Sequence, residues 1–283
     1  MTTTIRQQAI RVAVSGLVLG AGLAFGGVPL NNLQGVGGVA FNPLAYPSGQ
    51  NAEEDKDKGG LHLALSRPQI GAWYVRLGDV NVDWVAGGVS ETFFKRLELS
   101  YGYEIIAADG ADNIHKSNYG AKVLLLPENA GDNAFVPAVS VGGLWKTTDV
   151  NTGDTIDDAG WDAYVVATKL ITQLPRPVLL SGGLLYTDEL VTGVFGHDDQ
   201  HDLTWFANVD VLPFSFLAVG LEYKDGARFD DFQNASYWDA HVAWFVNPNL
   251  TLVGAYVNAG DSDPSSSKTG LGDGFVLSAQ YAF

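Results

Sequence analysis

The segment GFVLSAQYAF, residues 274–283, ends the chain and decides the fold. Phe275, Leu277, Ala279, Tyr281 and Phe283 form an apolar row at every second position. Successive side chains of a β-strand point to opposite faces, so this spacing predicts a strand with one continuous apolar face. An apolar row that runs to the last residue favours a face turned to lipid over a strand of a soluble β-sandwich.

The same alternation recurs upstream, in segments that are separated by turn-rich sequence. In residues 202–211, Leu203 and Trp205 lie on one face and Thr204 and Asp210 on the other. Twelve such segments begin near Ile70, Val80, Arg96, Lys116, Ala134, Trp161, Pro177, Asp202, Phe214, Tyr237, Leu250 and Gly274. The sequence therefore predicts an all-β protein, a closed antiparallel transmembrane β-barrel of about twelve strands, with ten or fourteen as the alternatives.

The connections between these segments alternate in length. Short turns at residues 212–213 and 247–249 flank a long loop at residues 224–236. By the same alternation, we expect a long loop at residues 107–117 and a short turn at residues 127–132. Short turns at one end and long loops at the other are typical of outer-membrane barrels.

Composition excludes several function classes. The 283 residues include 32 acidic and 16 basic side chains, which give a formal charge of −16. Such an acidic chain lacks the basic footprint that nucleic-acid binding requires. The sequence holds no cysteine, which rules out disulfides, thiolate metal sites and a cysteine nucleophile.

The first residues have the character of an export signal. Residues 1–11 are polar with two arginines, and residues 12–25 form an apolar run too short to cross a bilayer as a helix. We therefore expect a cleaved signal peptide at residues 1–24, a Gly-rich segment with a charged linker at residues 25–69, and the barrel at residues 70–283. The Gly-rich segment either folds into the lumen as a plug or forms a mobile tail.

Three stretches carry a resemblance to a known family: GGVPLNNLQGVGGVAFNPLAY, DAYVVATKL and YWDAHVAWFVNPNLTLVGAYVNAG. They resemble a proteobacterial family of uncharacterised outer-membrane β-barrel proteins, over nearly the whole mature chain. The row that ends on Phe283 is similar to the C-terminal signature read by the barrel-assembly machinery of Gram-negative bacteria. The resemblance implies a place in the cell outer membrane, among its lipids and lipopolysaccharide, and the assembly machinery as a partner during biogenesis. It implies no activity, and we expect a monomer.

Acidic side chains on the inward faces suggest what the barrel does. The alternation places Glu98, Glu104, Asp202, Asp210, Asp239 and His241 toward the lumen. Lys122 and Lys146 are the basic residues placed to oppose them. A lumen lined mainly by one sign of charge concentrates ions of the opposite sign. We therefore predict a small passive pore for ions or small polar solutes, with cation preference and without enzyme activity.

Two other functions stay open. A plugged barrel would have a structural or interaction role, with acidic outer loops that bind a partner or divalent cations. A membrane-embedded lipid hydrolase would use His241 to activate Ser215 on a neighbouring strand. Since Ser215 falls near a short turn and no oxyanion hole can be identified, a hydrogen-bond network in the lumen is the favoured interpretation of His241.

Two outer loops carry ligand atoms at spacings that metal ions use. Residues 149–158 resemble a calcium loop, although they depart from the EF-hand pattern at its sixth and twelfth positions. Residues 197–202 bring two histidines close to carboxylates, a set suited to zinc or nickel. The candidate ligands are Asp149, Asn151, Asp154, Asp157, His197 and His201. Solvation of polar loops is the favoured interpretation, so we predict no resident cofactor and leave Ca²⁺ or another divalent cation as the alternative.

Overall fold

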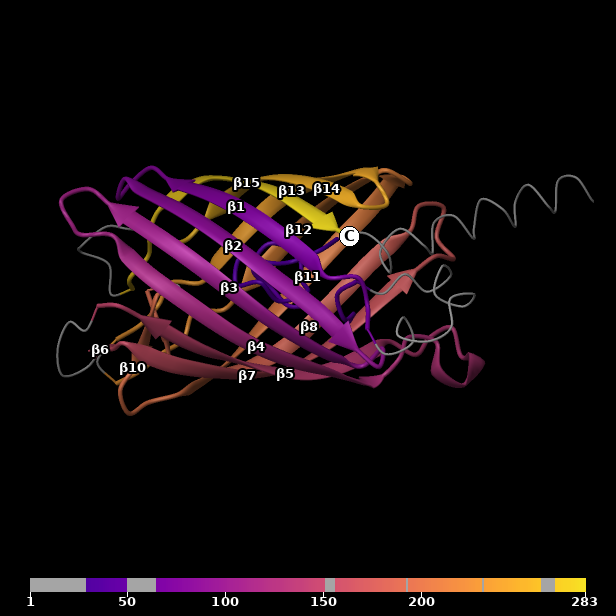
Figure 1. Cartoon of the computed structure of the whole chain (residues 1–283), viewed down its shortest axis with the longest axis horizontal. Coiled ribbons are helices and arrows are strands. Elements are labelled where there is room, and N and C mark those ends of the chain that lie inside the picture. The colour runs from indigo at the N-terminus through magenta and orange to yellow at the C-terminus, as the bar shows by residue number, and fades with distance from the viewer. Residues whose placement is uncertain (1–28, 50–64, 151–155, 192, 231, 261–267) are drawn as a thin grey trace, which may run out of the picture.

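A single closed barrel forms the body of the protein (Figure 1). The computed structural model describes residues 29–49, 65–150, 156–191, 193–230, 232–260 and 268–283. Twelve antiparallel strands form the wall: β1 (Gln69–Leu77), β2 (Val82–Phe93), β3 (Leu97–Ala108), β4 (Ile114–Leu126), β5 (Ala138–Thr148), β7 (Ala159–Ile171), β8 (Val178–Thr187), β11 (Asp202–Phe214), β12 (Leu217–Lys224), β13 (Tyr237–Asn247), β14 (Leu250–Asn258) and β15 (Asp273–Ala282). The predicted fold class and strand number are confirmed.

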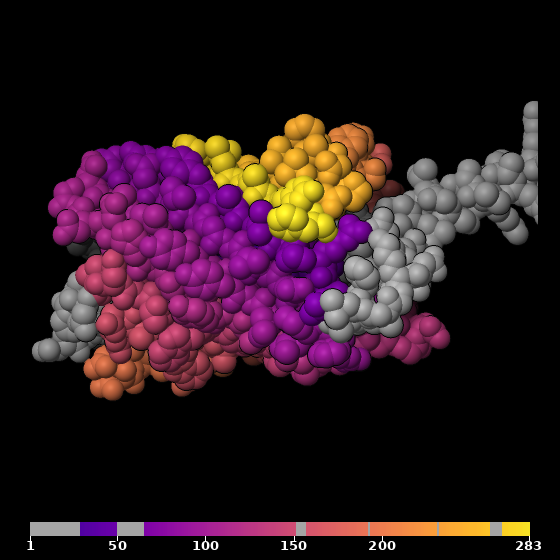
Figure 2. Space-filling model, viewed as in Figure 1, coloured from indigo at the N-terminus to yellow at the C-terminus, as the bar shows by residue number. Residues whose placement is uncertain are grey.

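The first and last strands close the wall. β1 pairs with β2 on one side and with β15 on the other, in a register that sets Gln69 against Ala282 and Leu77 against Gly274. In Figure 2 the yellow C-terminal residues lie directly against the violet residues that include β1. Closure gives every barrel strand a neighbour on both edges, which is the requirement for crossing a medium without water.

Two connections differ in length from the sequence prediction. The link between β3 and β4 spans only residues 109–113, because both strands continue into the stretch that was expected to be a loop. The link between β4 and β5 is longer than expected and spans residues 127–137, with the 3₁₀ helix η3 (Ala130–Asp132) inside it. Pro127 and Pro137 bound this link, and proline cannot donate a ladder hydrogen bond. Among the residues that the structure describes, no helical segment has the length and hydropathy needed to span a bilayer.

The two faces of the wall differ in chemistry. Along β11, Thr204, Asn208 and Asp210 are buried on the inside, whereas Leu203 and Trp205 are exposed on the outside. Exposed apolar side chains cover the outer face on all sides, among them Val85, Leu99, Tyr101, Tyr119, Trp145, Val165, Leu184, Leu221, Val242, Trp244 and Leu277. Monomeric soluble proteins rarely expose so continuous an apolar surface, whereas a lipid-facing band has this composition.

The inside of the barrel is occupied by residues 29–49, drawn in indigo within the wall in Figure 1. This segment folds back on itself, with backbone hydrogen bonds from Asn32 to Val36 and from Leu33 to Ala40. A three-stranded sheet of β6 (Ile156–Asp157), β10 (Phe195–His197) and β9 (Glu189–Leu190) lies at one mouth of the barrel. The short strands of this sheet come from the two links that follow β5 and β8.

A charge on the outer face tests whether that face meets lipid. Val242 is central in β13 and 44% exposed. We expect Val242→Arg to lower the free energy of unfolding in lipid vesicles by about 2–4 kcal/mol, because the guanidinium would lie in hydrocarbon. Urea titrations of the refolded protein measure this. Asn113→Arg, on an exposed link, is the control and should change stability by no more than about 0.5 kcal/mol. Equal effects at both positions would contradict a lipid-facing surface.

Candidate functional site

The carboxylate of Glu98 holds the two ends of a loop in the segment at residues 29–49. Its Oε1 accepts a hydrogen bond from the backbone N–H of Gly37 at 2.9 Å, and its Oε2 accepts one from Ser48 at 2.7 Å. Glu98 lies on β3 directly opposite Lys122 on β4, and the two side chains form an ion pair at 2.9 Å. Both side chains are at most 1% exposed, so the segment and the ion pair shield each other from water.

The ammonium of Lys122 binds the same segment from the other side. Its Nζ donates to the carbonyl oxygens of Gly37, Leu44 and Tyr46 at 2.9–3.1 Å. A Cβ at Gly37 would lie 2.7 Å from Oε2 of Glu98 and 2.9 Å from Nζ of Lys122. A larger residue at position 37 would therefore have to displace these two charged groups, whereas glycine lets the backbone approach them.

A second carboxylate, Glu222 on β12, binds the tip of the segment. Its Oε2 accepts hydrogen bonds from the backbone N–H groups of Ala40 and Phe41 at 3.0 and 2.8 Å. Its Oε1 accepts a bond from Nδ2 of Asn208 at 2.6 Å, and Oδ1 of that amide accepts one from Nδ2 of Asn42. Glu98 and Glu222 thus fix the segment to two different walls of the barrel through buried hydrogen bonds.

Uncharged side chains hold the rest of the segment. They come from five further strands and comprise Gln69, Gln280, Ser90, Ser140 and Thr168, which bond to Leu30, Asn31 and Ala45. The segment therefore contacts inward side chains all around the wall. Its apolar side chains Leu30, Val39 and Leu44 pack with inward residues of β12, β13 and β14 at one end of the lumen.

A buried histidine lies between two carboxylates next to Glu222. His241 Nδ1 is 2.7 Å from Asp239 Oδ1, and His241 Nε2 is 2.8 Å from Asp210 Oδ1. The side chains of Asp210 and His241 meet over Gly220, which lies between them in the strand register and has no Cβ to obstruct them. Two carboxylates that face both ring nitrogens suit the doubly protonated ring. The second oxygens of Asp210 and Asp239 have no hydrogen-bond partner among the described residues.

Charged side chains also form a network at the mouth of the barrel, where they join wall strands to the small sheet. Lys146 Nζ is 2.9 Å from Asp162 Oδ1 and 3.3 Å from Glu189 Oε1, and Lys224 Nζ is 2.6 Å from Glu189 Oε2. Burial opposes ionisation of Glu189, but the ammonium groups of Lys224 and Lys146 outweigh it and hold the pKa of this carboxyl well below its usual range. The network therefore anchors β9 to the wall.

Asp188 and His201 lie at the edge of this network. Burial raises the pKa of Asp188 to about 6, although Lys146 and the N–H of Trp161 oppose the shift. Burial also lowers the pKa of His201, whose ring stacks on Tyr186 with centroids 4.9 Å apart. The two side chains are 3.8 Å apart, and Asp188 Oδ1 and His201 Nε2 lack hydrogen-bond partners among the described residues.

Five of the six residues predicted to line the lumen point into it. Glu98, Glu104, Asp210, Asp239 and His241 are all at most 2% exposed. The sixth, Asp202, is half-buried at the start of β11, where its Oδ2 accepts a bond from the N–H of Arg228. Glu104 pairs with Lys116 at 3.1 Å and also accepts bonds from Trp84 and Asn118.

Sequence reasoning missed Glu222, Asp162 and Glu189. Glu222 could have been found, because the alternation in β12 places it inward between Gly220 and Lys224. Ser215 is exposed in the turn after β11, whereas His241 is buried with both ring nitrogens bound to aspartates. The structure thus does not bring these two residues together.

The candidate metal ligands are only partly described. Asn151 and Asp154 lie outside the described residues, while Asp149 Oδ1 accepts a bond from the N–H of His115 and Asp157 Oδ1 one from Ala159. His197 accepts bonds at Nδ1 from the N–H groups of Asp199 and Gln200, and His201 lies beside Asp188 as above. Within the described ranges, no group of three or more histidine or acidic side chains could hold a metal ion. A divalent cation at these loops stays a prediction.

Solved structures of outer-membrane porins share this architecture. The NanC porin superposes with a TM-score of 0.52 at 11% identity, over 76% of this chain and 99% of that one. The KdgM porin in complex with disordered oligogalacturonate superposes with a TM-score of 0.50 at 12% identity, over the same shares of the two chains. At these identities the likeness shows the fold alone.

The sequence itself carries the family relationship. No curated protein matches this chain. A family model matches residues 26–278, which is most of the sequence. The chain therefore belongs to the family described as "Protein of unknown function (DUF3034)".

Proposed function

We propose that this protein is an outer-membrane channel whose lumen is closed by residues 29–49. The observation that carries the proposal is the set of hydrogen bonds that Glu98 and Glu222 accept from the backbone of that segment and that Lys122 donates to it. The apolar outer face and the porin-like fold support the membrane location. The expected signal peptide, which lies outside the described residues, agrees with export.

The chemistry of the lumen favours a removable plug over a permanent core. Buried apolar groups resist hydration, whereas carboxylates and ammonium groups regain strong hydrogen bonds when water replaces the segment. The wall groups that hydrogen-bond residues 29–49 include Glu98, Lys122 and Glu222, which are of the second kind, whereas Leu30, Val39 and Leu44 of the segment pack on apolar wall side chains. Release of the segment would therefore leave a wall that water and small polar solutes can wet.

Cation preference follows from the balance of buried charge. Among the described residues, eight carboxylates are buried, namely Glu98, Glu104, Asp162, Asp188, Glu189, Asp210, Glu222 and Asp239. Four lysines are buried, namely Lys116, Lys122, Lys146 and Lys224, and buried His241 between two aspartates is a fifth positive group in its doubly protonated form. An excess of acids along a narrow path attracts cations and repels anions. We assign the protein no enzymatic role, because His241 is taken up by two aspartates and Ser215 lies in an exposed turn.

The proposal that residues 29–49 close the lumen is tested by removing the two charged side chains, Glu98 and Lys122, that bind this segment. We expect the double variant Glu98→Gln, Lys122→Met to conduct in planar bilayers far more often than the wild type, because five hydrogen bonds to residues 29–49 are weakened or lost. Charged hydrogen bonds contribute about 1.5–3 kcal/mol each, so even one of them shifts the open fraction by roughly 10-fold to 100-fold. Single-channel recording measures the open fraction directly.

The matched control removes a buried ion pair that does not touch the segment. Lys146→Met with Asp162→Asn has the same charge change and should leave the channel closed as often as the wild type. Deletion of residues 27–60 is the open reference. If the deletion variant folds into a heat-modifiable barrel but shows no conductance, the protein is a structural barrel and the channel proposal is wrong.

Selectivity is tested in the deletion background, where the lumen is open. We expect Asp210→Asn with Asp239→Asn to move the reversal potential in a salt gradient toward zero, because two inward carboxylates lose their charge. Asp132→Asn, on the exposed link between β4 and β5, is the control and should leave the potential unchanged. An unchanged potential in the double variant would mean that these aspartates do not set the preference.

A further inference from the structure

One wall of the lumen is apolar in the half that faces the small sheet. Inward side chains of β1, β2 and β14 form it, among them Val75, Leu77, Trp84 and Val257, each at most 5% exposed. The interiors of outer-membrane barrels are ordinarily polar, and this lumen also carries the ion pairs described above and a second apolar cluster that includes Phe245 and Val253. An apolar wall in such a place gains stability only when an apolar group covers it.

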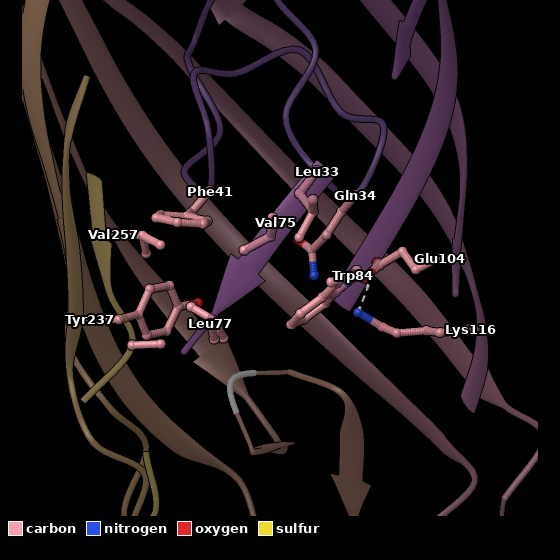
Figure 3. Close-up of a pocket in the computed structure, with 11 residues that line it drawn as sticks. Leu33, Gln34, Phe41, Val75, Leu77, Trp84, Glu104, Lys116, Tyr237 and Val257 are labelled. Carbon is pink, nitrogen blue, oxygen red and sulfur yellow. Dashed lines mark hydrogen bonds and ion pairs between the residues drawn. The ribbon is translucent and has the colours of Figure 1, made fainter. Parts of the chain in front are cut away.

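Residues 29–49 supply that group. The ring of Phe41 stands edge-on to Tyr237 with centroids 5.3 Å apart and planes at 86°, a favourable aromatic geometry. Phe41 is only partly buried, and it packs against the apolar wall (Figure 3). The backbone N–H of Phe41 donates one of the two hydrogen bonds that Glu222 accepts from the segment. The position of the ring therefore depends on that interaction.

A cavity lies beside the Phe41 ring. It has a volume of about 40 Å³ and lies between Leu33 and Phe41 of the segment and Trp84, Tyr237 and Val257 of the wall (Figure 3). That volume holds roughly three water molecules, whereas an apolar cavity that binds benzene measures about 150 Å³. A benzene-sized molecule therefore fits only if the Phe41 ring leaves. We call the cavity together with the place of this ring the Phe41 pocket.

One end of the pocket is polar. Lys116 and Gln34 lie there, and Lys116 Nζ donates to Glu104 Oε1 at 3.1 Å. An ammonium group has three donors, and this one makes no other hydrogen bond with the described residues. The neighbouring Glu104 balances its charge. This end therefore suits a neutral acceptor such as a hydroxyl or carbonyl oxygen, rather than an anion.

We propose that the Phe41 pocket binds a small, weakly polar aromatic molecule that carries one hydroxyl or carbonyl group, in the place where the Phe41 ring lies when the segment is seated. Binding and the seated ring exclude each other, so the ligand favours release of residues 29–49. The release of residues 29–49 by the ligand rests on the proposed function, to which it adds a class of solute and a trigger for opening. Binding itself does not require that the barrel conduct.

The test uses 4-fluorobenzyl alcohol as the probe and ¹⁹F NMR of the refolded full-length protein in lipid nanodiscs. We expect saturable binding to the wild type, and binding that is roughly 10-fold tighter to Phe41→Ala. This variant no longer has a partly buried aromatic ring that the ligand must displace, and partial burial corresponds to the lower end of the range for full burial, about 1.5 kcal/mol. Phe41→Leu, a milder change, should bind with intermediate affinity. Gel mobility with and without heating checks that each variant is folded.

Two tryptophan substitutions in the Phe41→Ala background locate the bound probe. Val257→Trp fills the pocket from β14 and should abolish saturable binding. Val242→Trp adds the same side chain on the lipid face and should leave binding unchanged. Binding that survives Val257→Trp, or a signal in every variant no larger than in empty nanodiscs, would overturn the proposal.

Conductance separates this proposal from the channel proposal. The probe should raise the open fraction of the wild type and have little effect on the variant that lacks residues 27–60, which is already open. Saturable binding without any conductance, even in the deletion variant, would contradict the channel proposal but not the binding-site proposal. Conductance in the deletion variant without saturable binding to Phe41→Ala would contradict the binding-site proposal alone.

Discussion

Every part of this structure depends on the pairing of β1 with β15. An open sheet would leave two rows of backbone donors and acceptors exposed, at a cost of several kcal/mol for each group in a medium without water. The register from Gln69 opposite Ala282 to Leu77 opposite Gly274 removes both edges. Once the wall is closed, each strand has one face toward the surroundings and one toward the lumen, and the alternation of side chains becomes a division between apolar and polar surfaces.

That division places many charges in a narrow space. Charged groups are rarely buried without partners, because the loss of hydration is large. Here strand register supplies some partners, since Glu98 faces Lys122 and Glu104 faces Lys116 on paired strands. The segment at residues 29–49 supplies the others, with backbone N–H groups for Glu98 and Glu222 and carbonyl oxygens for Lys122. The segment and the charges of the wall therefore stabilise each other.

The segment contacts two kinds of surface, and they have different consequences. Its polar contacts can be exchanged for water, which suits a part that leaves and returns. Its Phe41 ring covers an apolar wall, which water cannot do without a cost in free energy. In the proposed channel, a molecule that replaces the ring is therefore the one expected to favour opening.

Apolar and polar side chains alternate in segments such as residues 202–211 and 274–283, and this alternation determined the strands. A strand with one apolar face can turn only that face to an apolar environment. The strand starts at Asp202, Tyr237 and Leu250 agree with the structure, and five of six lumen residues were found from the same alternation. The ends of the links were less predictable, as residues 109–113 and 127–137 show, because a strand continues wherever a neighbour can pair with it.

What lies inside the barrel was decided by tertiary structure alone. Nothing local in residues 29–49 indicates a partner, since the groups that bind Gly37 and Ala40 are 61 and 182 residues away in the chain. The meeting of Asp210 and His241 over Gly220 likewise needs three strands to be in register. Sequence alternation assigns a side chain to a face, but only closure sets which side chains on that face come within a few ångströms of one another.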